Sequence, residues 1–253
     1  MKALLIIPEF KLEQNNSIIF LVLTTVIFSY VTYWIYIHSN SFKIFCAKYF
    51  KDDSFIIHKI LIGRFLGFFV LGVVPILILV SFTNFSLNSL GLQFPIENID
   101  VHLKWISILG VMAVFVNWLR RNNKENLLKY PQIRINKWNK VLVIKNIISW
   151  NFYLIGYEIL FRGVLLFPLY YILGPVPAII INSILYSLAH FPKGKSESIG
   201  SILLGTILCV LTLETGTIYI AFFVHVILAI SNFLISLNQH RKMDYSNLKS
   251  TAS

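Results

Sequence analysis

Residues 147–172 have the sequence IISWNFYLIGYEILFRGVLLFPLYYI, in which Glu158 and Arg162 are the only charged side chains. About 20 predominantly apolar residues are enough for a helix to cross the hydrocarbon of a bilayer. A charged side chain at that depth is costly unless it is paired or wetted, so such residues usually mark a functional cavity. The stretch therefore predicts a transmembrane helix with a polar site inside it.

The rest of the chain is similarly apolar. Hydrophobic residues make up 57% of the 253 residues, charged residues only 13%, and the mean hydropathy is +0.72. This is more apolar side chain than one soluble core of this size needs. Further long apolar runs lie at 17–37, 65–82, about 101–119, 175–190, 199–213 and 217–237. We expect an all-α, polytopic transmembrane helical bundle of about seven spans, with room for an eighth, re-entrant segment.

The distribution of the 22 Lys and Arg residues indicates how the spans are oriented. Eighteen of them lie in residues 38–64, in residues 120–145, in the loop after His190 and in the C-terminal tail. With alternating spans, all four segments fall on one side of the membrane, and cytoplasmic loops are the ones enriched in Lys and Arg. We therefore expect the C-terminus in the cytoplasm, and we attribute the net charge of +11 to membrane topology rather than to nucleic-acid binding.

The long basic loop divides the chain. Cys46 and Cys209 are too few for a disulfide framework, and no repeated halves of the kind found in many transporters are visible. We expect the basic loop to lie in the cytoplasm, where it would touch anionic headgroups. The expected regions are an N-terminal three-helix membrane region (1–119), a basic cytoplasmic connector (120–146), a catalytic helical region (147–237) and a polar cytoplasmic tail (238–253).

Four ionisable side chains in the C-terminal half are the candidates for chemistry. Glu158 and Arg162 lie one helical turn apart on one face and can pair. His190 ends one apolar run, and His225 lies inside another that extends from 218 to 230. A general base, a general acid or a metal ligand is thus present in each of three apolar segments. If these segments pack together, they form one polar pocket.

These residues and their neighbours resemble the motifs of a known family of intramembrane proteases. The sequence YEILFRG at 157–163 is similar to the first motif, Glu-Glu-x-x-x-Arg, and YSLAH at 186–190 to the second, aromatic-x-x-x-His. His225 matches the histidine of the third motif, and order and spacing agree over about 150–237. The family is that of the CAAX-processing and bacteriocin-processing proteases, called CPBP or Abi proteins.

The resemblance implies an endopeptidase that hydrolyses a peptide bond near the cytoplasmic membrane surface with a water activated by glutamate and histidine. Carried over to this chain, His190 would help to deprotonate the water and Glu158 would orient or share that proton. His225 would donate to the oxyanion, and Arg162 would hold Glu158 in place. The expected location is a bacterial plasma membrane, and the expected partners are the lipid bilayer and a peptide or protein substrate in or near it.

Two positions depart from the family pattern. Tyr157 stands where the first motif has its leading glutamate, and Ala229 stands where the third motif commonly has Asn or Asp. Asn232 lies on nearly the same helix face as the third-motif histidine and is a candidate substitute. Glu197 is a second candidate carboxylate, which would either fold back over the site or cap the next helix as an N-terminal acid.

Two other functions fit the same residues. Glu158, His190 and His225 form a two-histidine, one-carboxylate set suited to catalytic zinc, although the sequence lacks a His-Glu-x-x-His signature. We expect no cofactor, with zinc as the alternative. With Tyr157 and Ala229 in place, the chain could instead be a catalytically impaired family member that binds a peptide or lipidated protein in an immunity or scaffold role.

Overall fold

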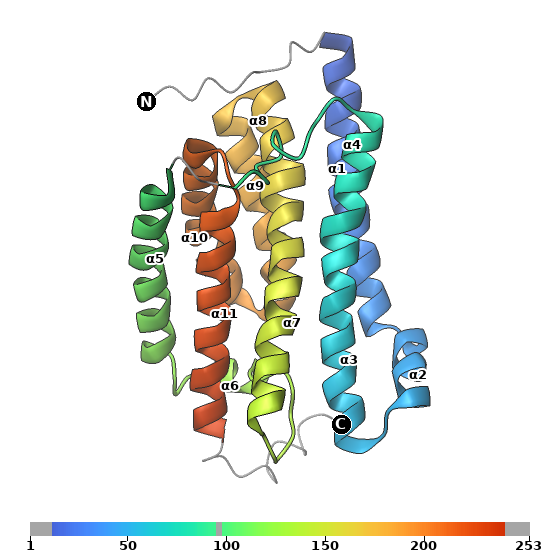
Figure 1. Ribbon diagram of the computed structural model, residues 1–253, viewed down its shortest axis with the longest axis vertical. Helices are drawn as coiled ribbons and strands as arrows, with labels where there is room; N and C mark the ends of the chain where they lie inside the picture. The colour runs from blue at the N-terminus through green and yellow to red at the C-terminus, as the bar shows by residue number, and fades with distance from the viewer. Residues whose placement is uncertain (1–11, 95–97, 241–253) are drawn as a thin grey trace.

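In the computed structural model, residues 12–94 and 98–240 are described, and the helices account for most of them (Figure 1). In chain order, the α-helices are α1 (Leu12–His38), α2 (Asn40–Tyr49), α3 (Asp52–Gly67), α4 (Val74–Phe82), α5 (Ile99–Leu119), α6 (Lys124–Lys129), α7 (Lys140–Glu158), α8 (Phe167–Leu173), α9 (Pro175–His190), α10 (Lys195–Thr215) and α11 (Tyr219–His240). The chain also contains two π-helical segments, η1 (Phe68–Val73) and η3 (Ile159–Leu166), and a 3₁₀ turn, η4 (Phe191–Lys193). The described residues contain no β-strand, which confirms the all-α bundle.

Six helices or helix chains in the described part are long and apolar enough to cross a membrane. The 16-residue α9 is shorter and coincides with the apolar run expected at 175–190. All seven expected runs are thus helical. The basic segment 38–64 between the first two apolar runs, whose residues 43–59 read as a long loop in the sequence, instead contains α2 and most of α3. Ser39 caps α2 by accepting a hydrogen bond from the amide of Phe42, a signal that the apolar runs alone do not reveal.

Both π-helical segments lie just before a proline. Segment η1 is followed by Pro75 and segment η3 by Pro168, each at the second residue of the next α-helix. Proline has no amide hydrogen, and its ring clashes with the carbonyl four residues earlier. A widened turn before the proline relieves this conflict without ending the helix. As a result Asp52–Phe82 and Lys140–Leu173 each run as one long helix with a wide turn near the middle.

The two widened helices cross at glycines. A Cβ atom on Gly72 would lie 2.9 Å from the Cα of Gly156, and one on Gly156 would lie 2.8 Å from the Cα of Phe68. Backbones approach this closely only where side chains are missing, as in other membrane bundles. Gly156 directly precedes Tyr157 and Glu158, so this crossing sets the level along the bundle axis at which these two residues lie.

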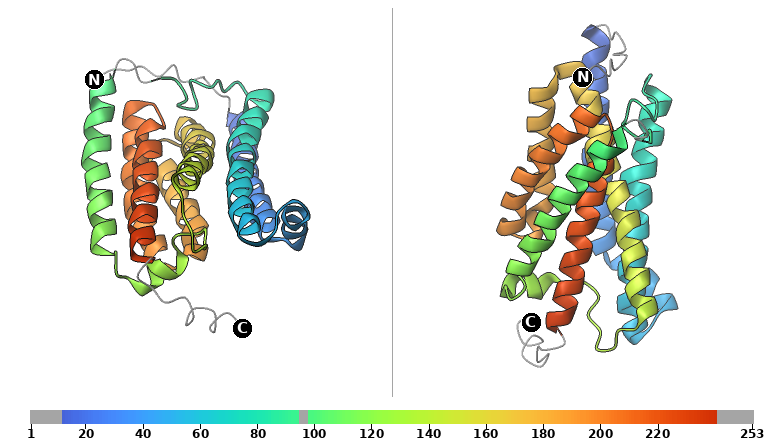
Figure 2. Two further views of the ribbon diagram at one scale, coloured as in Figure 1. Left: turned by 60° about the horizontal axis from the view of Figure 1, so that its bottom comes forward. Right: turned by 60° about the vertical axis from the view of Figure 1, so that its left-hand side comes forward.

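The helix Lys140–Leu173 forms the centre of the bundle. In its most apolar window 83% of the residues are buried, against 22–44% for the other five candidate spans. Helices α1, α3 and α4 lie on one side of it, and α9, α10 and α11 lie on the other (Figures 1 and 2). Helix α5, the third span of the expected N-terminal region, does not join α1, α3 and α4 but packs against α11.

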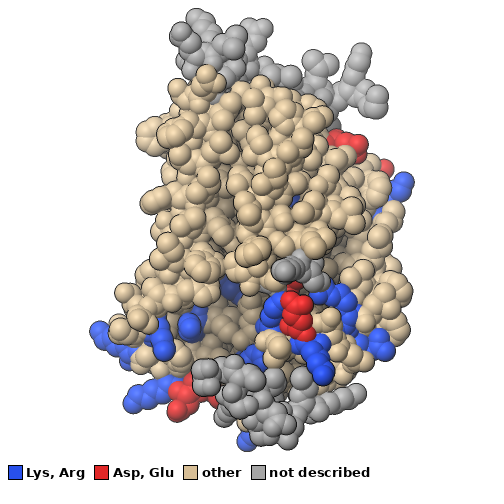
Figure 3. All heavy atoms as spheres, turned by 180° about the vertical axis from the view of Figure 1, so that it is seen from behind, with Lys and Arg blue, Asp and Glu red and all other residues tan. Residues whose placement is uncertain are grey.

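The surface is divided into an apolar belt and a basic end. Figure 3 shows Lys and Arg gathered at the end of the bundle where α11 terminates, below a broad zone without charges. Large apolar side chains point outward from this zone, including Phe20 and Phe28 of α1 and Val111 and Phe115 of α5. A bilayer would satisfy these side chains, and the structure therefore agrees with an integral, multi-pass membrane protein.

Candidate active site

Glu158 and Arg162 form a fully buried ion pair at the junction of α7 and η3. Both side chains have 0% exposure, and 3.5 Å separates Nε of Arg162 from Oε2 of Glu158. The guanidinium also donates from Nη1 to Oδ1 of Asn182 at 3.2 Å and lies over the ring of Tyr186 at 4.3 Å. The expected pairing is confirmed, and a neutralised pair is how two charges can share a site inside a membrane bundle.

The other carboxylate oxygen of Glu158 contacts His225. Its Oε1 lies 2.7 Å from Nδ1 of His225, the shortest contact between two of the candidate residues. A carboxylate paired with arginine only accepts hydrogen bonds, so Nδ1 of His225 carries the proton. In the neutral imidazole Nε2 is then the basic nitrogen, and among the described residues it has no hydrogen-bond partner. The arrangement is a carboxylate that orients a histidine.

His190, the last residue of α9, lies on the same site. Its Nδ1 lies 2.9 Å from the carbonyl oxygen of Tyr186 and 3.3 Å from the hydroxyl of Tyr157, and its ring centroid is 6.3 Å from that of His225. The structure therefore brings Glu158, His190 and His225 together, as the sequence predicted. Tyr157, at the position of the missing glutamate, is itself buried and reaches His190 with its hydroxyl group.

Asn182 is a site residue that the sequence reasoning missed. It accepts hydrogen bonds from Arg162 and from Sγ of Cys209 through Oδ1, and its Nδ2 donates to the carbonyl oxygen of Phe161. That carbonyl belongs to the π-helical segment, so Asn182 supports both the backbone and the ion pair. The available signal was the single carboxamide in the mostly apolar helix α9, since a polar group there needs a partner.

A pocket of about 370 Å³ opens beside the two histidines. His190, His225 and Tyr186 line it, together with Glu197, Asn232 and the other polar residues Asn117, Arg120, Asn126, Tyr130 and Ser201. Apolar side chains from α5, α10 and α11 also line it. They comprise Leu109, Met112, Ala113, Val116, Leu203, Leu204, Ile207, Leu228 and Ala229. A cavity of this size with a few convergent polar groups is typical of a ligand or substrate site.

Glu197 occupies both of the positions that the sequence suggested. It lies in the first turn of α10, where an acid is favourable, and it also lines the pocket. Its Oε2 accepts a hydrogen bond from the hydroxyl of Tyr130 at 3.3 Å. Burial, and next the charge of Glu197, raise the pKa of Tyr130 above its usual value, so this phenol remains a hydrogen-bond donor.

Asn232 reaches the pocket from α11, and its partner comes from the connector. Nδ2 of Asn126 in α6 donates to Oδ1 of Asn232 at 2.9 Å, and Nδ2 of Asn232 lies 3.3 Å from Oδ1 of Asn126. Asn126 also lines the pocket. The basic connector therefore contributes directly to the site, which the sequence did not indicate.

A catalytic zinc ion would require three protein ligands close together. Within residues 12–94 and 98–240, no three His, Cys, Asp or Glu side chains are arranged closely enough to hold a metal ion. Glu158 contacts Arg162 and His225, and a ligand carboxylate would have to give up these contacts.

The comparison with protein families addresses the segment that carries these residues. Residues 140–231 match the Rce1-like family, described as type II CAAX prenyl endopeptidase Rce1-like. This segment belongs to the CPBP family. The CPBP match includes Glu158, His190, Glu197 and His225, and it ends one residue before Asn232. Searches of curated proteins and of solved structures found no match.

Proposed function

We propose that the chain is an intramembrane endopeptidase that hydrolyses a peptide bond close to the membrane surface. One observation carries the proposal: a buried carboxylate contacts His225, and His225 and His190 line one pocket that also has apolar side chains from three helices. Such a pocket can hold an apolar group while the backbone next to it lies beside the histidines. The CPBP match over the same helices supports a protease.

The contacts favour His225 as the residue that activates water. Glu158 would hold the imidazole by Nδ1 and stabilise its positive charge, as the aspartate does in Ser-His-Asp enzymes. As the water oxygen bonds to the carbonyl carbon, its proton would pass to Nε2 of His225. When the C–N bond breaks, the leaving amine takes up that proton. A positioned base and acid of this kind typically accelerates a reaction by 10²–10⁴-fold.

In its protonated form, His190 would then stabilise the oxyanion of the tetrahedral intermediate: its Nδ1–H donates to the carbonyl oxygen of Tyr186, and only the imidazolium has a second N–H, on Nε2, to donate. Both histidines line the pocket, and their ring centroids are 6.3 Å apart, so one carbonyl group can lie near both rings. This assignment exchanges the roles that the family resemblance implied for the two histidines. The reason is that the 2.7 Å contact of Glu158 is with His225.

The pocket also suggests the class of substrate. Its apolar walls from α5, α10 and α11 suit a lipid-modified or transmembrane peptide, and the matched family is described by its action on prenylated CAAX ends. We propose that the basic end of the bundle, where Lys and Arg gather, faces the cytoplasm.

A quenched fluorescent peptide with a farnesylated CAAX end, and the same peptide without farnesyl, would test this function in liposomes. We expect the wild type to cleave the farnesylated peptide. The variants Glu158→Gln, His190→Ala and His225→Ala should each reduce the cleavage rate by at least about 100-fold. Glu125→Gln is the control, because Glu125 is exposed and outside the pocket. Equal turnover by the wild type and Glu158→Gln, with all proteins folded, would refute the proposed mechanism.

A second function is favoured by Tyr157, which replaces the leading glutamate of the first motif. A protein without that carboxylate could bind a peptide or lipidated protein and leave it intact. Saturable binding of the farnesylated peptide by the wild type without turnover would support this function. Turnover gained in Tyr157→Glu would then identify the missing carboxylate as the cause.

A further inference from the structure

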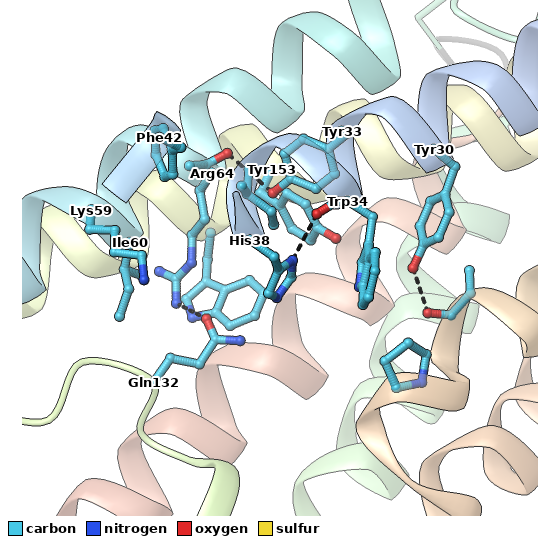
Figure 4. Close-up of a pocket in the computed structure, with 15 residues that line it drawn as sticks. Tyr30, Tyr33, Trp34, His38, Phe42, Lys59, Ile60, Arg64, Gln132 and Tyr153 are labelled. Atoms are coloured by element: carbon cyan, nitrogen blue, oxygen red, sulfur yellow. Dashed lines mark hydrogen bonds between the residues drawn. The ribbon is translucent and has the colours of Figure 1, made fainter. Parts of the chain in front are cut away.

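A second pocket, of about 350 Å³, lies between the α1–α3 side of the bundle and α7 (Figure 4). It is near the end of the bundle where Lys and Arg gather, and it is separate from the pocket of the two histidines except for Trp150, which lines both. Six of its fifteen lining residues are Tyr, Trp or Phe: Tyr30, Tyr33, Trp34, Phe42, Trp150 and Tyr153. The proposed peptidase reaction uses none of these residues.

Arg64 of α3 lines this pocket and is almost completely buried, with 5% exposure. Its Nη1 donates to Oδ1 of Asn146 at 2.8 Å and to Oγ of Ser149 at 2.9 Å, and its Nη2 donates to Oε1 of Gln132 at 2.9 Å. The guanidinium carbon lies 3.9 Å from the ring centre of Trp150. All of these partners are neutral.

The contrast with the other buried arginine is informative. Arg162 has the carboxylate of Glu158 at 3.5 Å, whereas no carboxylate in the described part of the chain lies within 4 Å of Arg64. In addition, Nε of Arg64 is buried and has no hydrogen-bond partner among the described residues. Burying a charge without a counter-charge is strongly unfavourable, so Arg64 has an unmet requirement for an anion.

The other polar residues at this pocket also favour an anion. Lys59 and His38 line it together with Arg64, and no Asp or Glu does. Figure 4 shows Arg64 directed toward Gln132, with Lys59 on one side and Trp34 and His38 across the cavity. A phosphate group suits such a site, because a guanidinium offers it several charge-assisted hydrogen bonds in a planar fork.

The aromatic walls and the location indicate where the phosphate would come from. Tyr and Trp favour the boundary between hydrocarbon and headgroups, and basic pockets between helices bind anionic headgroups. We propose that this pocket binds the headgroup phosphate of an anionic phospholipid, with Arg64 as its charge partner and Lys59 at the edge. The bound lipid would join the α1–α3 side of the bundle to α7 and α9.

Thermal unfolding of the full chain in neutral detergent, with added lipid, would test the proposal. Dioleoyl-phosphatidylglycerol at about 100-fold its Kd should raise the unfolding midpoint of the wild type by roughly 5–10 °C. Dioleoyl-phosphatidylcholine should raise it much less. Arg64→Gln should reduce the response to phosphatidylglycerol to the level seen with phosphatidylcholine.

Arg121→Gln is the matched control, because Arg121 lies at the same basic end but stacks on Trp118 outside the pocket. It should retain the response to phosphatidylglycerol. If Arg64→Gln does not fold, the half-exposed Lys59→Gln must show a weakened response. If inorganic phosphate alone raises the unfolding midpoint as much as phosphatidylglycerol does, the anion site is supported but its ligand is a soluble phosphate.

Two results would overturn the proposal. One is a wild type that responds equally to the two lipids and does not respond to phosphate. The other is an Arg64→Gln variant that folds and retains the full preference for phosphatidylglycerol. The peptidase reaction is not measured in this experiment, so its outcome is independent of the proposed catalytic mechanism.

Discussion

Removal of Glu158 should destabilise the protein mainly through the charge that it leaves behind. In Glu158→Leu the guanidinium of Arg162, with 0% exposure, retains only Asn182 and the ring of Tyr186 as partners. Breaking one half of a buried ion pair typically costs about 3–5 kcal/mol. At roughly 2–4 °C per kcal/mol for a chain of this size, the unfolding midpoint should fall by about 6–20 °C.

A double-mutant cycle separates the charge effect from lost packing. The double variant Glu158→Leu/Arg162→Met has no unpaired charge, so it should unfold at a higher temperature than Glu158→Leu alone. The exposed pair Glu125–Lys129 has the same spacing and provides the control. Glu125→Gln should leave the midpoint within the error of the measurement. Strictly additive effects at Glu158 and Arg162 would refute the argument that the two charges depend on each other.

Three further predictions concern packing, pH and metal. Gly156→Ala should destabilise the protein by about 1–3 kcal/mol in a thermal scan, because its Cβ would lie 2.8 Å from the Cα of Phe68. The control Gly200→Ala should not destabilise it, because a Cβ at Gly200 would meet no atom within 4 Å. Folding disfavours the phenolate of Tyr130, whose pKa is raised by burial and by Glu197, so stability should fall as pH rises above about 10, and less steeply in Tyr130→Phe. Peptidase activity should survive a chelator, and loss of activity that zinc restores would favour the metal mechanism.

The apolar runs predicted the fold because a transmembrane helix is recognisable from its own residues. Seven runs became helices, and the run at 175–190 coincides with α9. Their lateral order could not be predicted, since it depends on which faces pack together. Helix α5 therefore lies against α11 rather than beside α1. Pro75 and Pro168 did carry a readable signal for the two widened turns, because proline inside a long helix requires such an adjustment.

The ionisable residues of the site were predictable, but their contacts and the two asparagines Asn126 and Asn182 were not. Spacing placed Glu158 and Arg162 on one helix face, and a short-range rule was sufficient for that pair. Which histidine meets Glu158 depends on how α11 and α9 are rotated against α7, and no local pattern contains that information. The same holds for Asn126, which reaches the pocket from a connector far away in sequence.

The polar contacts of the bundle interior have a consequence for how the protein is made. Cys209, Asn182, Arg162, Glu158 and His225 form one continuous chain of contacts through α10, α9, η3, α7 and α11. A translocon releases helices one after another. Glu158 pairs with Arg162 within its own helix, but it meets His225 only when α11 has been synthesised. A ribosome stalled before α11 should leave a chain that the membrane quality-control proteases degrade.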